Sequence, residues 1–292
     1  GSITYRFMFH SWRIPNRNSC VNWSYMSERI KNTASFIRNR VNFEPEVGII
    51  LGTGLGGLVE SIDIRATLDY AEIPDFPVST VEGHAGRFIF GMLGGRRVVA
   101  MQGRFHYYEG YTPQQVVFPV WVMKFLGVGR LFVSNASGGV NPSFRTGDLM
   151  VITDHINLIP NPLIGPNDPE LGPRFPDMSE PYDAGLIALA AEVACREGIQ
   201  LQYGCYIGVT GPTFETRKEY RFYRTAGADT VGMSTTPEVI AANHAGLPVF
   251  AVSIITNMGL DGMKSTHEEV QREGAKAEAK MTRLFVGMLE AL

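Results

Sequence analysis

The sequence has few cysteines. Only three occur among 292 residues, Cys20, Cys195 and Cys205, and they form neither a C-x-x-C pair nor a zinc-like spacing. This pattern excludes a disulfide-rich secreted scaffold and a cysteine zinc site. We therefore expect reduced thiols and a cytoplasmic location.

Long apolar runs and a marked excess of charge are also missing. No stretch reaches the roughly 18 uncharged apolar residues of a membrane span. The formal net charge is −3, so the whole-chain charge does not indicate binding to nucleic acid or to an anionic membrane. Any affinity for an anion must come from local groups. We find no Asp-rich calcium site, and we predict small-molecule substrates and no metal.

The remaining composition is that of an ordinary globular protein. The chain is 45% hydrophobic and 19% charged, which allows a sizeable core within one large α/β unit. Residues 1–25 stand apart because they hold Arg6, Arg13 and Arg17 but no acidic residue. We expect an N-terminal extension there, either a transit peptide or a tag, that is poorly ordered, and a single domain over residues 26–292.

Apolar, β-rich runs alternate with helical stretches along this domain. Most of the runs are continuously apolar, as expected of strands that are covered on both faces. The strand candidates are 47–51, 88–92, 97–102, 130–135, 149–158, 204–210, 228–232 and 248–256. Helix starts are predicted at Thr112, Asp183, Thr236 and Thr266, two of them as capping boxes. The pattern predicts an α/β fold with a central mixed, largely parallel sheet flanked by helices.

One loop is too long to be a passive connection. Residues 159–182 are rich in proline and glycine, and long loops of this kind usually have a function. We expect this loop to contribute to a functional site or to a contact between subunits.

Residues 48–57 read GIILGTGLGG, and Gly52–Gly57 fit the dinucleotide pattern G-x-G-x-x-G. A dinucleotide fold needs a second strand about 20 residues further on, ending in an acidic residue. Glu72 lies at a suitable distance, but residues 58–75 hold no sustained apolar run to form that strand. A glycine-rich turn with a hydroxyl at Thr53 suits a single phosphate instead. A simple tight turn is the alternative.

Polar residues follow several of the other predicted strands. Because open α/β sheets bind ligands beyond the carboxyl ends of their strands, we expect these side chains to meet. Taken singly, each has an ordinary structural explanation, such as a solvated arginine or a buried, hydrogen-bonded asparagine. Together they predict a phosphate-binding set beside a purine-reading set: Thr53, Arg104, His106 and Ser234 for phosphate, and Phe214, Glu215 and Asn257 for the base.

Ten ordered motifs, from about Met26 to the C-terminus, give the domain a specific resemblance. It resembles the trimeric purine nucleoside phosphorylases in GTGLGG, STVEGHAGRF, QGRFHYYEGY, SNASGG, DHINL, GPNDPELGPRFPDMS, GPTFET, VGMSTTPEV, SIITN and THEEV. The resemblance implies a homotrimer that carries out reversible phosphorolysis, in which orthophosphate is a co-substrate and no cofactor is needed. Orthophosphate displaces the purine from a (deoxy)nucleoside and leaves (deoxy)ribose 1-phosphate.

The resemblance also implies roles for individual residues. The implied phosphate site comprises Thr53, His84, Arg104, His106, the backbone of Ala136, and Ser234. The implied ribose contacts are Tyr108, Met233 and His267. The implied purine contacts are Phe214, Glu215 and Asn257, with Asn257, His106 and Glu215 as the catalytic residues. His84 and Glu109 resemble neighbours that orient this set.

The implied purine contacts have a direct chemical rationale. The Asn257 amide has a donor and an acceptor, so it can bond N7 and O6 of the leaving base together. An ionised Glu215 accepts from N1–H of a 6-oxopurine, whereas adenine offers a lone pair at N1. Such a buried mismatch can give roughly 10⁴-fold discrimination. We therefore expect inosine and guanosine to be preferred over adenosine.

Some features depart from the family, and rival functions remain. Some relatives send an aromatic side chain from the 159–182 loop into the neighbouring subunit's site, and the nearest match here is Leu171.

Methylthioadenosine phosphorylase is the alternative within the fold, although Asn257 and His267 both argue against it. An NAD-dependent dehydrogenase, a non-catalytic nucleoside-binding protein and a nucleoside hydrolase are rivals from other classes.

Overall fold

The computed structural model describes residues 24–52, 55–78, 80, 86–259 and 266–292. Its α-helices are α1 (Ser24–Val41), α2 (Pro113–Phe125), α3 (Ala184–Glu197), α4 (Arg217–Ala226), α5 (Thr236–His244) and α6 (His267–Ala291). Its strands are β1 (Val47–Ile50), β2 (Asp63–Asp69), β3 (Arg87–Leu93), β4 (Arg96–Gln102), β5 (Arg130–Gly139), β6 (Leu149–Asn157), β7 (Leu201–Gly208), β8 (Thr230–Gly232) and β9 (Val249–Met258). Short 3₁₀ helices are η1 (Gly56–Ser61), η2 (Tyr70–Glu72) and η3 (Tyr107–Glu109).

The described strands form one mixed sheet in the order β2-β3-β4-β1-β5-β8-β7-β6-β9. Parallel pairs are β1–β4, β1–β5, β5–β9, β6–β7 and β7–β8, and antiparallel pairs are β2–β3, β3–β4, β5–β8 and β6–β9. Because β9 also pairs with β5, the strands β5, β8, β7, β6 and β9 close into a ring. The predicted mixed sheet is therefore confirmed, and part of it is barrel-like.

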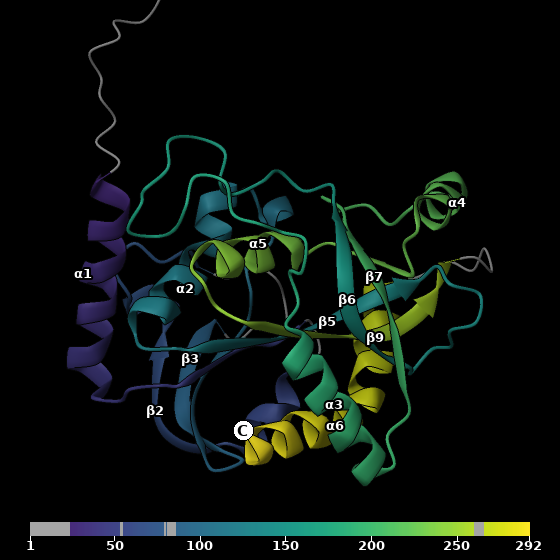
Figure 1. Ribbon diagram of the computed structural model, residues 1–292, viewed down its shortest axis with the longest axis horizontal. Helices are drawn as coiled ribbons and strands as arrows, with labels where there is room; N and C mark the ends of the chain where they lie inside the picture. The colour runs from purple at the N-terminus through teal and green to yellow at the C-terminus, as the bar shows by residue number, and fades with distance from the viewer. Residues whose placement is uncertain (1–23, 53–54, 79, 81–85, 260–265) are drawn as a thin grey trace, which may run out of the picture.

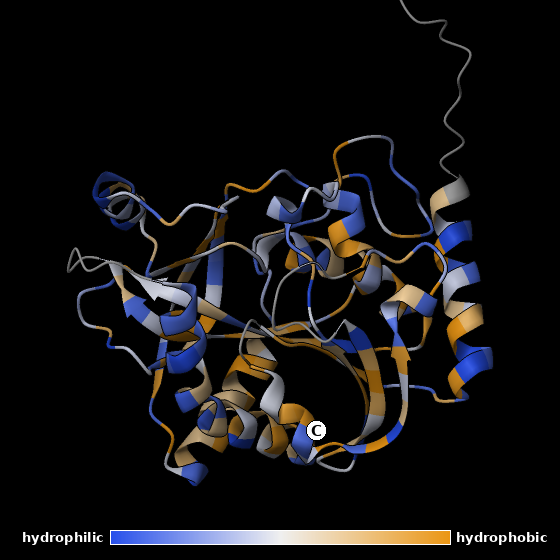
Figure 2. Ribbon diagram, turned by 180° about the vertical axis from the view of Figure 1, so that it is seen from behind, coloured by the Kyte–Doolittle hydropathy of each residue, from blue (hydrophilic) through white to orange (hydrophobic). Residues whose placement is uncertain are grey.

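Helices cover this sheet on two sides (Figure 1). α1, α2 and α5 pack over one apolar core, which includes Ile37, Val117 and Ala241. α3 and α6 cover a second core, which includes Val193 and Phe285. Figure 2 shows orange, apolar stretches in the strands of the sheet and in the helices beside it. No described helix is both long and apolar enough to cross a membrane.

All eight predicted strands are present, but the sequence did not predict β2. This strand lies at the edge of the sheet, and in the whole of β2 only Leu68 is buried, so it shows no sustained apolar run. Residues 58–75 therefore do hold a strand, although it has no sustained apolar run. However, β2 pairs only with β3, while β1 lies between β4 and β5. The strand that a dinucleotide fold would need beside β1 is therefore not supplied by β2.

The predicted helix starts are confirmed, three of them by side-chain caps. Thr112 accepts a hydrogen bond from the Gln115 N–H at 3.2 Å, and the Gln115 side chain accepts one from Thr112 at 2.8 Å. Asp183 begins α3, Thr235 precedes α5, and Thr266 begins α6 with a capping box. The first described residues, from Ser24, form α1, so the last two residues of the expected extension already belong to a helix.

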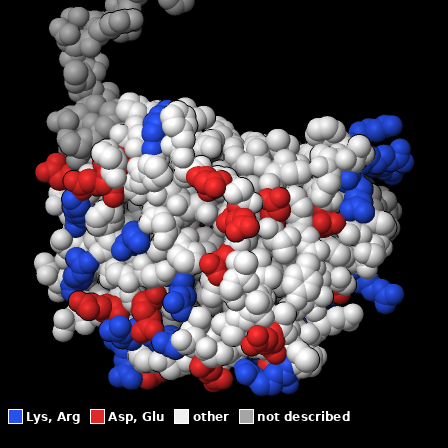
Figure 3. All heavy atoms as spheres, viewed as in Figure 1, with Lys and Arg blue, Asp and Glu red and all other residues white. Residues whose placement is uncertain are grey.

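Charge is distributed unevenly over the surface. Figure 3 shows Lys and Arg side chains gathered at the end of the molecule where α4 lies in Figure 1, whereas both signs are interspersed over the rest of that face. The sequence of α4, RKEYRFYRTA, accounts for the cluster. This clustering does not conflict with the net charge of −3, because acidic residues elsewhere offset it.

Candidate active site

The carboxyl ends of β4, β5, β7, β8 and β9 and the start of α6 surround one cavity of about 420 Å³. Its lining residues are Arg104, His106, Tyr108, Asn135, Ala136, Ser137, Gly138, Pro212, Phe214, Glu215, Val231, Gly232, Met233, Ser234, Thr256, Asn257, His267 and Val270. Every described residue that we predicted to contact phosphate, ribose or purine lies in this lining, and the orienting neighbour Glu109 lies behind it. The other two predicted residues, Thr53 and His84, lie outside the described residues.

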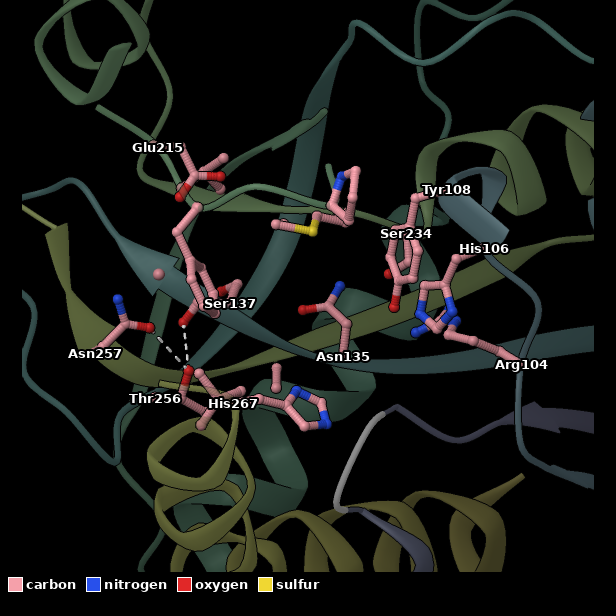
Figure 4. Close-up of a pocket in the computed structure, with 18 residues that line it drawn as sticks. Arg104, His106, Tyr108, Asn135, Ser137, Glu215, Ser234, Thr256, Asn257 and His267 are labelled. Carbon is pink, nitrogen blue, oxygen red and sulfur yellow. Dashed lines mark hydrogen bonds between the residues drawn. The ribbon is translucent and has the colours of Figure 1, made fainter. Parts of the chain in front are cut away.

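The two predicted sets lie at different sides of the cavity. Figure 4 shows Glu215 and Asn257 on one side and Arg104, His106 and Ser234 on the other, with Asn135 between them. His267 is the first residue of α6, directly after the predicted capping residue Thr266, and it lines the cavity from that end of the helix. The geometry therefore suits a ligand with two chemically different ends.

Arg104 follows β4 and is almost completely buried, with 1% of its surface exposed. Its Nε and Nη2 groups donate to the Glu238 carboxylate at 3.1 and 2.6 Å, and its Nη1 donates to the Ser134 carbonyl at 2.7 Å. A buried guanidinium needs such a partner because an unpaired buried charge is very costly. The sequence analysis missed Glu238, which lies in the first turn of α5.

His106 is buried beside Glu109. Its Nδ1 lies 3.0 Å from the Glu109 carboxylate, which also accepts the His106 backbone N–H at 2.7 Å, and its ring stacks on Tyr108. Burial lowers the pKa of His106, although Glu109 opposes this. Burial would raise the pKa of Glu109, but hydrogen bonds from His106 and Thr80 outweigh it and lower the pKa to about 2. The pair is therefore a neutral imidazole oriented by an ionised carboxylate near pH 7.

The segment after residue 135 differs from its predicted form. We expected a turn of small residues, but β5 continues to Gly139 and pairs with both β8 and β9. Asn135 donates to the Thr235 hydroxyl at 2.8 Å, and its carbonyl accepts from Ser253. Ser253 also contacts Ser137. These buried groups form a hydrogen-bonded floor beneath the cavity, which the sequence did not reveal.

Ser234 lies where β8 meets α5. Its backbone N–H donates to the buried Tyr206 hydroxyl at 3.2 Å, and its own hydroxyl lies 3.0 Å from that of Thr235. Thr235 has a φ of 69°, which is strained for a β-branched residue. Strained residues of this kind often occur at functional sites, so the observation supports a functional role for this corner.

The opposite side of the cavity holds a carboxyl group and an amide. Burial raises the pKa of Glu215, and a hydrogen bond with Tyr220 opposes the rise. The Asn257 carbonyl oxygen accepts from the Thr256 hydroxyl at 3.1 Å. Asn257 faces Gly138 across a β-bulge between β5 and β9. Phe214, which we considered a possible core residue, is 44% exposed and lines the cavity instead.

The glycine-rich stretch does not lead into a long helix. Its last two residues begin the six-residue η1. The N–H of Leu58 donates to the Glu278 carboxylate of α6 at 2.9 Å, and a side chain at Gly57 would collide with that carboxylate. A side chain of the protein therefore meets the start of η1, where a dinucleotide fold would place a pyrophosphate. This finding argues against the hypothesis that the chain is an NAD-dependent dehydrogenase.

Leu171 was the nearest match in this loop to the intersubunit aromatic residue of some relatives, and within this chain it does not face outwards. Leu171 is only 7% exposed and packs in the core of its own chain, whereas Phe175 in the same loop is 86% exposed. A separate cavity of about 610 Å³ lies beside this loop, and Phe175 and Arg174 help to line it. Phe175 is thus the aromatic residue that this loop presents to its surroundings.

Comparison with known proteins agrees with the geometry. The chain belongs to the phosphorylase superfamily, whose family model matches residues 46–290. It is 53% identical to purine nucleoside phosphorylase 1 of Bacillus subtilis, over 89% of this chain and 97% of that protein. It is 49% identical to the purine nucleoside phosphorylase of Bos taurus, over 91% and 96% of the two chains.

Solved structures give the same result. The crystal structure of Schistosoma mansoni purine nucleoside phosphorylase in complex with inosine has a TM-score of 0.87 and 44% sequence identity, covering 91% of this chain and 96% of that one. An adenosine complex of the enzyme from the same organism has the same TM-score and identity. Within the superfamily, this chain is accordingly a purine nucleoside phosphorylase, an enzyme that splits purine nucleosides with phosphate.

Proposed function

We propose that this enzyme prefers the 6-oxopurine nucleosides inosine and guanosine, and that the two sides of its cavity divide the reaction between them. The placement of Glu215 and Asn257 opposite Arg104, His106 and Ser234 carries the proposal. Phosphate is the co-substrate, and no step is assigned to a metal. A cytoplasmic location remains a prediction from the cysteine pattern.

Phosphate binds, in this proposal, at the side formed by Arg104, His106 and Ser234. Arg104 and the Ser234 hydroxyl supply donors, and Glu109 and Tyr108 hold the His106 ring in place. A phosphate held beneath C1′ attacks as the glycosidic bond breaks and positive charge grows on the ribose. Holding both reactants in this way removes much of the entropic barrier. His267, Tyr108 and Met233 contact the ribose.

The purine leaves from the side formed by Phe214, Glu215 and Asn257. Negative charge grows on the base as the bond breaks, and the Asn257 amide bonds N7 and O6 while Glu215 accepts from N1–H. Loss of one donor at such a position typically raises the barrier by about 3–4 kcal/mol. The 6-amino group and unprotonated N1 of adenine would mismatch both residues.

A substrate panel tests the preference. We expect kcat/KM for inosine and guanosine to exceed that for adenosine and methylthioadenosine by at least about 100-fold, because a buried polar mismatch can give up to roughly 10⁴-fold. All four nucleosides would be assayed at saturating phosphate, with release of the free base measured. Equal or greater activity on methylthioadenosine would overturn the proposal in favour of the alternative phosphorylase.

We also propose that the enzyme assembles as a homotrimer, as its resemblance to the trimeric family implies. Exposed apolar side chains on and beside the 159–182 loop support this, namely Leu158, Ile164 and Phe175. Clustered apolar exposure of this kind is typical of a subunit contact. In some relatives an aromatic side chain from this loop reaches the neighbouring site, and Phe175 is the exposed aromatic residue that could do so here.

A further inference from the structure

The hydrogen-bonded floor beneath the cavity is a continuous row of side chains that ends at Ser234. In order, the row consists of Ser137 of β5, Ser253 of β9, Asn135 of β5, and then Thr235 and Ser234 just before α5. The first four are almost completely buried, and polar groups at such depth need hydrogen-bond partners. Figure 4 shows Asn135 in the middle of the cavity, between its two sides.

The number of protons fixes the direction of the first bonds in this row. A serine hydroxyl has one proton, and Ser253 donates its proton to the side-chain carbonyl of Asn135. The bond between the Ser253 and Ser137 hydroxyls is therefore donated by Ser137. At the other end of the Asn135 amide, Nδ2 donates to the Thr235 hydroxyl at 2.8 Å. Every one of these bonds points towards Thr235.

The last bond joins the row to the cavity. Oγ1 of Thr235 lies 3.0 Å from Oγ of Ser234, which lines the cavity. The Thr235 oxygen accepts from Asn135, so its own proton can be given to the Ser234 oxygen, and the Ser234 proton then turns towards a ligand. Phosphate oxygens accept hydrogen bonds, so a bound phosphate requires this orientation. The Ser234 backbone is held separately, because its N–H donates to the Tyr206 hydroxyl at 3.2 Å.

The conformation of Thr235 shows that its hydroxyl serves the floor and not the helix. Thr235 occupies the N-cap position of α5, yet its side chain makes no capping hydrogen bond, whereas Thr112 and Thr266 both cap their helices in this way. Its φ of 69° is unfavourable for a β-branched residue and persists only where the surroundings enforce it. The bonds of its hydroxyl to Asn135 and Ser234 are part of those surroundings.

We propose that this row is a directional hydrogen-bond relay that keeps the Ser234 proton pointed at phosphate, with Thr235 and Asn135 as positioning residues. The inference rests on the proposed function, because it requires Ser234 to bind phosphate. In a chain in which each hydroxyl both accepts and donates, every bond polarises and strengthens the next. Thr235 and Asn135 therefore contribute to phosphate binding through Ser234.

A double-mutant cycle of Thr235→Val and Ser234→Ala tests the relay. We expect Ser234→Ala to raise KM for phosphate about tenfold, as for a lost hydrogen bond to a charged group, and Thr235→Val to raise it about threefold. KM for inosine should change little in both. If Thr235 acts through the Ser234 hydroxyl, its substitution has no further effect once that hydroxyl is gone. The double variant should therefore match Ser234→Ala, and Thr235→Ser should restore the wild-type value.

Thr236→Val is the matched control for Thr235→Val. Thr236 is the next residue and is fully buried, and its hydroxyl donates to Asn157 at 2.7 Å, outside the floor and the cavity lining. The same substitution there removes a buried hydrogen bond of similar geometry. We expect this variant to keep the wild-type KM for phosphate, even if it is less stable.

Ser253→Ala tests the far end of the row and does not depend on the folding of Thr235→Val. It removes the donor that fixes the carbonyl end of the Asn135 amide. We expect it to raise KM for phosphate in the wild-type background and to have no effect in the Ser234→Ala background.

An unchanged KM for phosphate in Thr235→Val, additive increases in the double variant, or an equal increase in Thr236→Val would overturn the relay and leave the phosphate site in place. Failure of the proposed function is a different result, because Ser234→Ala would then itself leave KM for phosphate unchanged.

Discussion

At the scale of single residues, the buried polar and charged groups in the cavity wall have fixed partners. Arg104 is paired with Glu238 of α5, and His106 with Glu109. Each pairing offsets the cost of burying a charge and fixes the direction of the side chain. The site is therefore organised before any ligand arrives, which is the condition for efficient electrostatic catalysis.

Asn257→Asp tests the assignment of the base reader. A carboxylate can accept from a 6-amino group but cannot donate to O6. We expect kcat/KM for inosine to fall by about 10²–10³, as is typical when such a donor is removed, and activity on adenosine to rise. The measurement is the rate of base release from each nucleoside, and an unchanged preference would mean that Asn257 does not read the base.

The ionisation of Glu215 should appear in the pH dependence of activity. Burial raises the pKa of this carboxyl, so it is protonated at a higher pH than an ordinary glutamate. A protonated Glu215 cannot accept from N1–H. We expect kcat/KM for inosine to fall as pH drops through this raised pKa, and the acidic limb to vanish in Glu215→Gln, which keeps an acceptor oxygen. An acidic limb that persists in the variant would assign it to another group.

Single residues were also the level at which sequence and structure agreed best. The residues predicted at the strand ends lie together because the carboxyl ends of strands in an α/β sheet meet at one edge. This prediction requires no knowledge of individual contacts. Glu238 was missed because it acts through another side chain, that of Arg104, and carries no local motif. The burial of Leu171 and the exposure of Phe175 could not be predicted, because the sequence of a proline-rich loop does not show which of its apolar residues is buried.

At the scale of secondary-structure elements, the long strands β5 and β9 and the start of α5 shape the floor of the cavity. β5 runs to Gly139, four residues beyond its predicted end at residue 135, and its last residues carry the bulge opposite Asn257. β2 escaped prediction because an edge strand with one buried residue has no clear apolar pattern. In both cases the strand forms by pairing with neighbouring strands, which the sequence pattern does not show.

The strained start of α5 gives a stability prediction. The Thr235 hydroxyl accepts the buried Asn135 amide at 2.8 Å. Thr235→Val keeps the shape but leaves that donor unsatisfied, so we expect the free energy of unfolding to fall by about 1–3 kcal/mol. Thr235→Ser keeps the hydroxyl and should be close to wild type. Urea denaturation of the two variants measures the difference, and equal stability would show that this bond contributes little.

At the scale of the whole molecule, the ring of β5, β8, β7, β6 and β9 brings residues far apart in the sequence to one cavity. The two predicted sets lie across that cavity, so a single fold positions both reactants. The exposed apolar side chains around the 159–182 loop lie outside this arrangement, and in the proposed trimer a second copy of the chain covers them.

Phe175→Ala tests whether the neighbouring subunit completes the site. We expect the wild-type enzyme to sediment as a trimer. The variant should raise KM for inosine with a smaller effect on KM for phosphate, because Phe175 would close the nucleoside side. Leu158→Ala is a matched control from beside the same loop, as it removes exposed apolar surface without removing an aromatic ring. A wild-type monomer with full activity would contradict the trimer proposal.

The most direct measurement of the central claim is the cleavage of inosine by the purified enzyme with and without phosphate. We expect hypoxanthine and ribose 1-phosphate in equal amounts when phosphate is present, and no measurable cleavage when it is removed. Release of hypoxanthine with free ribose at the same rate in the absence of phosphate would contradict the claim.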